Sequence, residues 1–138
     1  MLGSPASLRT SLSALETYSK RETIIMALFA IAIPIIPEKL EKWRAFVGEL
    51  TTKRKAEFMA SRKKLGVRER TFHQHTPMGD FVIVTLEGDD PAGAFAKSAA
   101  GTDAFSQWFK QNVIDLHGSD PGNPPPGPLP TLIIDSGA

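Results

Sequence analysis

Residues 24–37 read IIMALFAIAIPIIP and contain no charged or polar side chain. A helix that crosses a membrane needs about 20 apolar residues, so this run is too short to span a bilayer. Its bulky side chains alternate with mostly smaller ones at a period of two, which is typical of a β-strand: Phe29, Ile31, Ile33 and Ile35 against Leu28, Ala30, Ala32 and Pro34. Because both faces are apolar, we predict a strand that is covered on both sides. Pro34 cannot donate a ladder hydrogen bond, so it should lie near the end of the strand or at a bulge.

A secretion signal is the alternative interpretation of the same run. Three basic residues precede it, as they do in signal peptides: Arg9, Lys20 and Arg21. However, the run ends in two prolines and the charged sequence EKLE, with no small-residue cleavage site. We therefore favour the strand, expect residues 1–25 to be a flexible or peripherally packed leader, and place a single domain at residues 26–138. Whether the leader belongs to the mature protein stays open at this point.

The composition is that of an ordinary globular domain. Hydrophobic residues make up 41% of the 138 positions and charged residues 22%, and the formal net charge of +1 gives no general attraction to nucleic acid or to membranes. The absence of cysteine excludes disulfides, thiol nucleophiles and thiolate zinc sites, and it is compatible with a reducing compartment. We expect a cytoplasmic protein with neither a nucleic-acid nor a membrane partner.

Helix and strand patterns follow the first strand. Residues 38–65 space their apolar side chains by three and four, which predicts one long amphipathic helix, with a bend at Gly48 and an end at Gly66. Residues 67–76 and 81–87 both alternate, and the turn sequence PMGD lies between them. We therefore predict a β-hairpin after the helix.

The last third of the chain predicts more helix and one short strand. Asp90-Pro91 is typical of a helix start, and a second helical piece covers residues 103–117. Residues 118–130 are too rich in proline and glycine for regular structure, and residues 132–134, Leu-Ile-Ile, read as a final strand. The resulting order predicts an α+β, ferredoxin-like βαββαβ fold, a four-stranded antiparallel sheet with two helices on one face.

The second face of this sheet needs a cover. Two helices protect one face only, yet the first and third strands are apolar on both faces. A large exposed apolar surface is unusual on a soluble monomer, and an identical subunit related by a two-fold axis is the simplest cover. We predict a homodimer formed through the open face of the sheet.

At the level of local sequence, residues 30–50, AIAIPIIPEKLEKWRAFVGEL, resemble the opening of the dimeric α+β barrel superfamily, with Pro37 directly before an acidic and aromatic helix start. That superfamily includes antibiotic-biosynthesis monooxygenase-like domains and haem-degrading relatives. The likeness in element order extends over about residues 26–136 and implies a dimer with a small-ligand pocket between sheet and helices. Many relatives have glycine where this chain has Glu38, and no catalytic residue carries over from them.

Histidines are the best candidates for chemistry. His73 and His75 are two apart in a predicted strand, so their side chains point to one face about 7 Å apart. We predict a catalytic acid–base role for them without a cofactor, since imidazole titrates near neutral pH. The alternatives are two solvent-facing histidines, or two ligands of one metal ion with Glu69 or His117 as the third. At the end of the second helix, His117 is interpreted as a cation that complements the helix dipole.

Ligand contacts are predicted from one basic and several aromatic residues. Arg54 continues the apolar stripe of the long helix, so it could point inward and bind a carboxylate or phosphate, or pair with Glu57 or Glu69. Trp43, Trp108 and Phe109 are predicted to line a ligand pocket, although aromatic side chains at helical spacing also fit a hydrophobic core. The basic run over residues 51–70 is interpreted as a solvated helix face.

Two functions are expected, in this order. The first is a small-molecule-binding dimeric α+β barrel protein, with a cofactor-independent monooxygenase-like enzyme as its catalytic form. The second is a non-catalytic dimer with a ligand-binding, stress or regulatory role. An RNA-binding module shares the element order but is disfavoured, because Phe29 and Phe81 are the only aromatic residues on the first and third strands.

Overall fold

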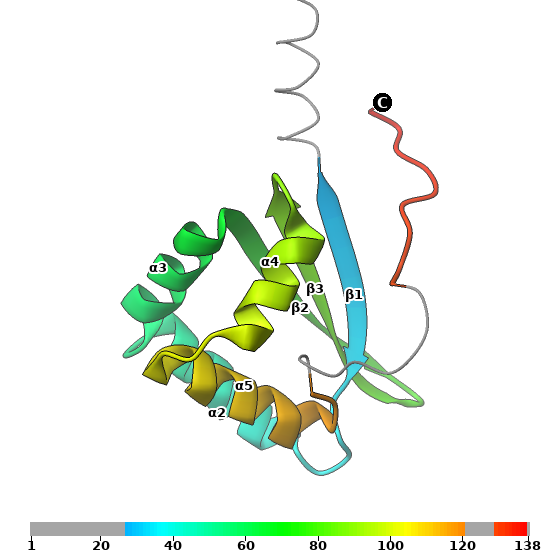
Figure 1. The fold of residues 1–138 in the computed structure, drawn as a ribbon. Coiled ribbons are helices and arrows are strands. Elements are labelled where there is room, and N and C mark those ends of the chain that lie inside the picture. The colour runs from blue at the N-terminus through cyan, green and yellow to red at the C-terminus, as the bar shows by residue number, and fades with distance from the viewer. Residues whose placement is uncertain (1–26, 121–128, 138) are drawn as a thin grey trace, which may run out of the picture.

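The computed structural model describes residues 27–120 and 129–137, which form an α+β fold with a three-stranded antiparallel sheet (Figure 1). The sheet order is β1-β3-β2, with the bounds β1 (Leu28–Pro34), β2 (Val67–Thr76) and β3 (Gly79–Gly88). The described helices are α2 (Leu40–Thr51), α3 (Lys55–Leu65), α4 (Pro91–Ala100) and α5 (Ala104–His117). Figure 1 shows these helices on the same side of the sheet. The other face of the sheet has no layer over it within the described part of the chain.

The apolar run forms β1, as predicted, and Pro34 is its last residue. Phe29 and Ile35 point toward the helices and are 7% and 5% exposed. Ala30 and Ala32, which alternate with them, are exposed on the opposite face. The period of two therefore separates a helix-facing side from an outer side of β1. The described part of the chain covers only the helix-facing side.

The predicted long helix over residues 38–65 is wrong in one respect, because it is divided at residues 52–54 into α2 and α3. The hydroxyls of Thr51 and Thr52 donate to main-chain carbonyls one turn back, Thr51 to Val47 at 3.0 Å and Thr52 to Gly48 at 2.5 Å. Such back-bonding competes with the helical ladder and bends or ends it. The break thus follows the predicted bend at Gly48 by one turn.

The hairpin and the later helices agree with the sequence. Only Pro77 and Met78 separate β2 from β3, so the turn is shorter than the four-residue PMGD. The carboxylate of Asp90 accepts a hydrogen bond from the Gly93 amide at 3.0 Å and caps α4, with Pro91 in the first turn. Gly118 ends α5 at φ 70°, a left-handed conformation that glycine adopts without strain.

The predicted fourth strand is not formed. Residues 132–134 lie outside every described strand, and the side chains of Leu132, Ile133 and Ile134 are 59%, 82% and 83% exposed. Their composition gives a local preference for extended structure, but a strand also requires a hydrogen-bonding partner along its length. The leader expected at residues 1–25 lies outside the described residues, as do residues 121–128 of the proline-rich connection.

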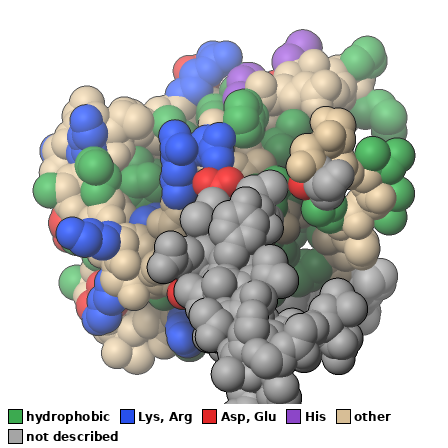
Figure 2. Space-filling view, turned by 90° about the horizontal axis from the view of Figure 1, so that it is seen from above, with side chains coloured by type: hydrophobic (Ala, Val, Ile, Leu, Met, Phe, Trp, Pro, Cys, Tyr) green, Lys and Arg blue, Asp and Glu red, His purple; other side chains and the backbone are tan. Residues whose placement is uncertain are grey.

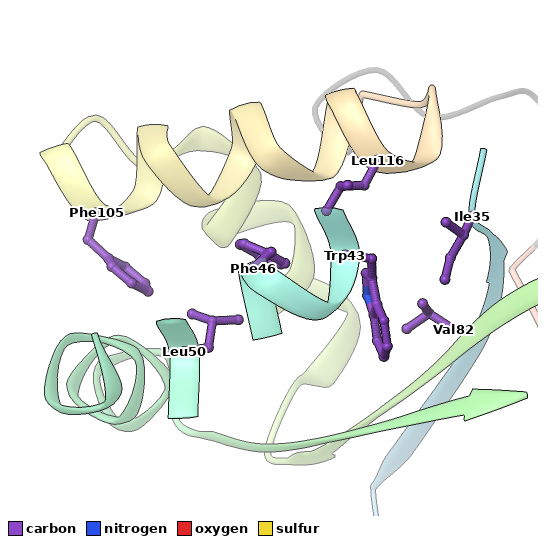
Figure 3. Packing of buried hydrophobic residues seen from close by; sticks show 7 residues of the cluster. All are labelled: Ile35, Trp43, Phe46, Leu50, Val82, Phe105 and Leu116. Atoms are coloured by element: carbon purple, nitrogen blue, oxygen red, sulfur yellow. The ribbon is translucent and has the colours of Figure 1, made fainter. Parts of the chain in front are cut away.

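The hydrophobic core lies between the sheet and the helices (Figure 3). Its buried members come from the end of β1, from α2, β3 and α5: Ile35, Trp43, Phe46, Leu50, Val82, Phe105 and Leu116. Two hydrogen bonds fix the end of α5 to the end of β1. The Ile36 amide donates to the Leu116 carbonyl at 2.9 Å, and His117 Nδ1 lies 2.9 Å from the Pro34 carbonyl oxygen.

Candidate functional site

The hairpin brings three polar side chains together at one end of the sheet. His75 lies directly opposite Asp80 in the β2–β3 register, and His73 lies opposite Val82. Val82 is 2% exposed in the core, so these side chains project from the helix-covered face. The predicted common face of His73 and His75 is confirmed, and Asp80 is an additional member of the cluster.

One oxygen of Asp80 serves both imidazoles. Asp80 Oδ1 is 2.8 Å from His73 Nε2 and 3.0 Å from His75 Nδ1. The hydrogen bond from His73, followed by that from His75, lowers the pKa of Asp80 below its usual 3.8, although partial burial opposes this shift. Because an ionised carboxylate only accepts hydrogen bonds, both contacting nitrogens carry a proton. In the neutral tautomer that donates to Asp80, the second ring nitrogen of an imidazole is a proton acceptor.

Trp43 connects this cluster to the core. Its ring centroid lies 5.2 Å from that of His73 at an interplanar angle of 45°, and its side chain is buried. The side chain of His73 is 26% exposed, whereas that of His75 is 78% exposed. A ligand reaching this end of the sheet would therefore meet an open imidazole, a sheltered imidazole and the edge of an apolar core.

The structure brings neither proposed third metal ligand into contact with the two histidines. Glu69 Oε1 binds Arg62 Nε at 2.8 Å, and His117 contacts the Pro34 carbonyl. Within residues 27–120 and 129–137, no group of three or more His, Asp or Glu side chains is arranged to hold a metal ion.

The side chain of Arg54 points inward, toward Trp108, as the apolar stripe of the helix predicts. Its guanidinium carbon lies 4.1 Å from the centroid of the Trp108 ring, a cation–π arrangement. The same side chain is 3.4 Å from Glu49 and 3.3 Å from Glu57, so the predicted pairing with Glu57 is present and that with Glu69 is not. Glu69 pairs instead with Arg62, a contact that spacing along the chain does not predict.

The predicted pocket-lining aromatic residues pack in the hydrophobic core or against its aromatic rings. Trp108 and Phe109 lie 5.3 Å and 5.4 Å from Phe46 by ring centroids, and Phe105 lies within 6.0 Å of both. Trp43 belongs to the core cluster, and Trp108 and Phe109 are half-buried beside it. These rings therefore form a continuous aromatic layer between the helices, and ligand contact would involve its exposed edges.

Figure 2 shows basic side chains at several places on one face, with hydrophobic side chains between them and a further hydrophobic group at the right edge of the view. Several are already paired with carboxylates, Lys53 with Glu49 at 3.6 Å and Arg70 with Glu87 at 3.3 Å. Lys63 and Lys64 at the end of α3 are exposed. Lys53, Lys63 and Lys64 therefore agree with the interpretation of the basic run as a solvated face, whereas Arg62 of the same run is buried.

His117 differs from its sequence interpretation. Burial lowers the pKa of His117 below 6.5, and the hydrogen bond to Pro34 opposes this shift only in part. A neutral imidazole with its proton on Nδ1 donates to the Pro34 carbonyl, so the residue joins α5 to β1. The interpretation as a cation at the helix terminus is therefore replaced by that of a neutral hydrogen-bond donor.

Asp80 is the functional candidate that sequence reasoning missed. The turn sequence PMGD predicts Asp80 within the turn, whereas the observed two-residue turn places it opposite His75. The length of the turn was the signal that could have revealed it.

Comparison of the chain with protein-family models, with curated proteins and with solved structures finds no match. None of the described helices is both long and apolar enough to cross a membrane. The fold and the contacts at the hairpin end are therefore the basis for a functional proposal.

Proposed function

We propose that this protein is a homodimer of the dimeric α+β barrel type that binds a small organic molecule and exchanges a proton with it at the cluster of His73, His75 and Asp80. The observation that supports this function is the single carboxylate oxygen of Asp80 within hydrogen-bond distance of both imidazoles. We expect the protein to act in the cytoplasm, without a cofactor, and to resemble cofactor-independent monooxygenases in its first step, removal of a proton from the ligand.

The chemistry follows from the shared acceptor. A carboxylate that binds one ring nitrogen of a histidine fixes the tautomer and the orientation of the ring, and it stabilises the imidazolium formed when the other nitrogen takes a proton. The side chain of His75 is 78% exposed, while His73 lies against Trp43. His75 is therefore the proposed general base, and His73 orients Asp80 from the sheltered side.

The dimer is supported by the outer face of the sheet. The register places a group of apolar side chains on this face: Leu28, Ala30, Ala32, Pro34, Phe72, Phe81 and Ile83. Polar and charged side chains share the face at its β2 side and its far end: Arg68, Arg70, Gln74, Thr85 and Glu87. Leu28 and Phe72 are 46% and 53% exposed in the single chain. A second copy packed sheet to sheet would remove this surface from water, at about 25 cal/mol for each Å² of apolar area.

A non-catalytic ligand-binding or regulatory dimer is the second candidate. The observation that favours it is the packing of Trp108 and Phe109 against Phe46, which places these rings in a structural layer. RNA binding is disfavoured because Phe29 faces the helices while Phe81, opposite Pro34 in the register, lies on the outer face. The two rings thus do not form a common platform for bases.

Light scattering tests the dimer. The wild type should scatter as a particle of twice 15.0 kDa at micromolar concentration. Ala32→Arg places a charge on the outer face and should give a monomer, while Thr102→Arg, on an exposed residue between α4 and α5, should leave the dimer intact. A stable, unaggregated wild-type monomer would rule out the dimer.

Proton exchange tests the site. A panel of aromatic carboxylic acids should raise the melting temperature of the wild type through linkage, and those that bind should exchange an acidic C–H for deuterium in D₂O. His75→Gln should slow this exchange by about 100-fold or more, whereas Arg44→Gln on the exposed side of α2 should not change it. Stabilisation without deuterium incorporation would favour the non-catalytic ligand-binding protein. If no acid raises the melting temperature, both proposed functions are ruled out.

A further inference from the structure

Among the described residues, one edge of β1 carries a defined set of backbone groups that no other strand pairs. The Gly88 amide donates to the Ala27 carbonyl at 3.1 Å, and the Ile35 amide donates to the Asp80 carbonyl at 2.9 Å. Antiparallel strands alternate between residues that bond one neighbour and residues that face the other side. The odd-numbered residues of β1 therefore bond β3, and the N–H and C=O groups of Leu28, Ala30 and Ala32 point toward the edge that β3 does not cover.

This edge is closed at one end. Pro34 follows in the same alternation but has no N–H, and its carbonyl is occupied by His117 Nδ1 at 2.9 Å. An added strand could therefore form a ladder along residues 28–32 and would have to stop before Pro34. Open edges of this kind pair readily with other chains, and natural proteins usually cover them.

A segment with matching length and composition follows α5. Residues 131–135 read TLIID, and none of them is in a described strand. Ile133 and Ile134 are more than four-fifths exposed, an unfavourable state for two β-branched apolar side chains. In Figure 1 this segment lies on the β1 side of the sheet and runs in the direction opposite to β1. We propose that residues 131–135 pair antiparallel with the free edge of β1 in the same chain, with Ile133 opposite Ala30.

The connection supports pairing within one chain. A Cβ on Gly118 would lie 3.2 Å from Ile36 Cδ1, so α5 ends beside the residues that follow β1. A strand antiparallel to β1 must begin at this end. About a dozen residues separate Gly118 from Thr131, and at about 3 Å per residue in extended form they reach the edge with length to spare.

The register follows from the alternation of side chains. Ala30 and Ala32 point to the outer face of the sheet, so Ile133 opposite Ala30 points the same way, together with Thr131 and Asp135. Leu132 and Ile134 then face the helix side, opposite the half-buried Ile31 and the buried Phe29. A slip by one residue would instead direct both Leu132 and Ile134 to the outer face and the polar ends of the segment toward the core side.

Disulfide trapping tests the pairing, because the wild type has no cysteine. Residues opposite each other in a hydrogen-bonded pair have Cα atoms about 5.5 Å apart, within the range that a disulfide spans. The double variant Ala30→Cys and Ile133→Cys should form an intrachain disulfide under mild oxidation. The control Ala30→Cys with Ile134→Cys, whose side chains would point to opposite faces, should cross-link at least about tenfold more slowly.

Hydrogen exchange of the unmodified protein gives an independent readout. The amides of Ala30 and Ala32 should exchange slowly in the wild type and in the control Ser136→Pro, whose substitution lies outside the segment. They should exchange about tenfold or more faster in Ile133→Pro, which lacks the hydrogen-bond donor at the centre of the ladder. Equal exchange in all three proteins would overturn the proposal, as would equal cross-linking of the two cysteine pairs. A disulfide between two chains would overturn pairing within one chain.

Discussion

Arg62 of α3 and Glu69 of β2 form an ion pair with a distance of 2.8 Å between Nε and Oε1, and both side chains are only 10% exposed. The guanidinium of Arg62 also lies over two rings, 4.8 Å from the centroid of Phe58 and 4.5 Å from that of Phe109. The pair therefore links the helix, the sheet and the aromatic layer at a place that water hardly reaches.

Removing one partner of this pair should be strongly destabilising. Glu69→Ala should lower the free energy of unfolding by about 3 kcal/mol, because the buried guanidinium loses its counter-charge. Arg70→Ala, which breaks the more exposed pair with Glu87, should cost about 0.5 kcal/mol. Urea unfolding monitored by tryptophan fluorescence measures both. Equal losses would show that the enclosure of Arg62 and Glu69 has no energetic effect.

Glu38 has a backbone conformation that favours glycine. Its φ is 76°, a left-handed value that costs a residue with a Cβ about 1 kcal/mol. Glu38→Gly should therefore raise the free energy of unfolding by up to about 1 kcal/mol, less the entropy that glycine adds to the unfolded chain. Glu41→Gly, within α2, should lower it by about 1 kcal/mol. If both variants are destabilised alike in thermal melts, the strain at Glu38 is absent.

Local sequence patterns predict most of the helices and strands, but few of the contacts between them. The period of two in β2 places His73 and His75 on one face whatever their partners are, and this prediction is confirmed. Asp80 required the register of the hairpin, which depends on a turn that is two residues long. The pairing of Arg62 with Glu69 depends on how α3 packs on β2, and no spacing along the chain encodes that geometry.

The same limit explains the two errors in the fold. The spacing of apolar residues continues through Thr51 and Thr52. Their hydroxyls, however, donate hydrogen bonds to main-chain carbonyls and interrupt the helix. The spacing of apolar residues cannot predict this effect, because it depends on polar side chains. Residues 132–134 have the composition of a strand and lack a hydrogen-bonded neighbour in the described structure. Composition predicts a preference for extended structure, but a strand forms only where a neighbouring strand supplies hydrogen-bond partners.

The hydrogen bonds to Asp80 should appear in the pH dependence of stability. Because the pKa of Asp80 is lowered in the folded state, its carboxylate stabilises the fold above 3.8, and that contribution is lost as the pH falls through the folded-state pKa. The difference in unfolding free energy between wild type and Asp80→Asn should therefore be largest near neutral pH and shrink in acid. Glu41→Gln, whose ion pair with Arg44 is open to solvent, should differ little from wild type. A difference for Asp80→Asn that is constant with pH would contradict the role of its charge.

His117 gives a pH dependence near neutrality. Burial lowers the pKa of His117 in the folded state below 6.5, so the unfolded chain takes up the proton first as the pH falls. The stabilising contribution of the neutral imidazole is complete above 6.5 and is lost progressively below it, toward the folded-state pKa. The wild type should thus lose stability relative to His117→Gln as the solution is acidified, whereas Gln111→Ala, an exposed position on the same helix, should follow the wild type in parallel. NMR titration of the His117 ring protons gives the folded-state pKa directly, and a midpoint at or above 6.5 would show that its contact with Pro34, and not burial, controls the charge.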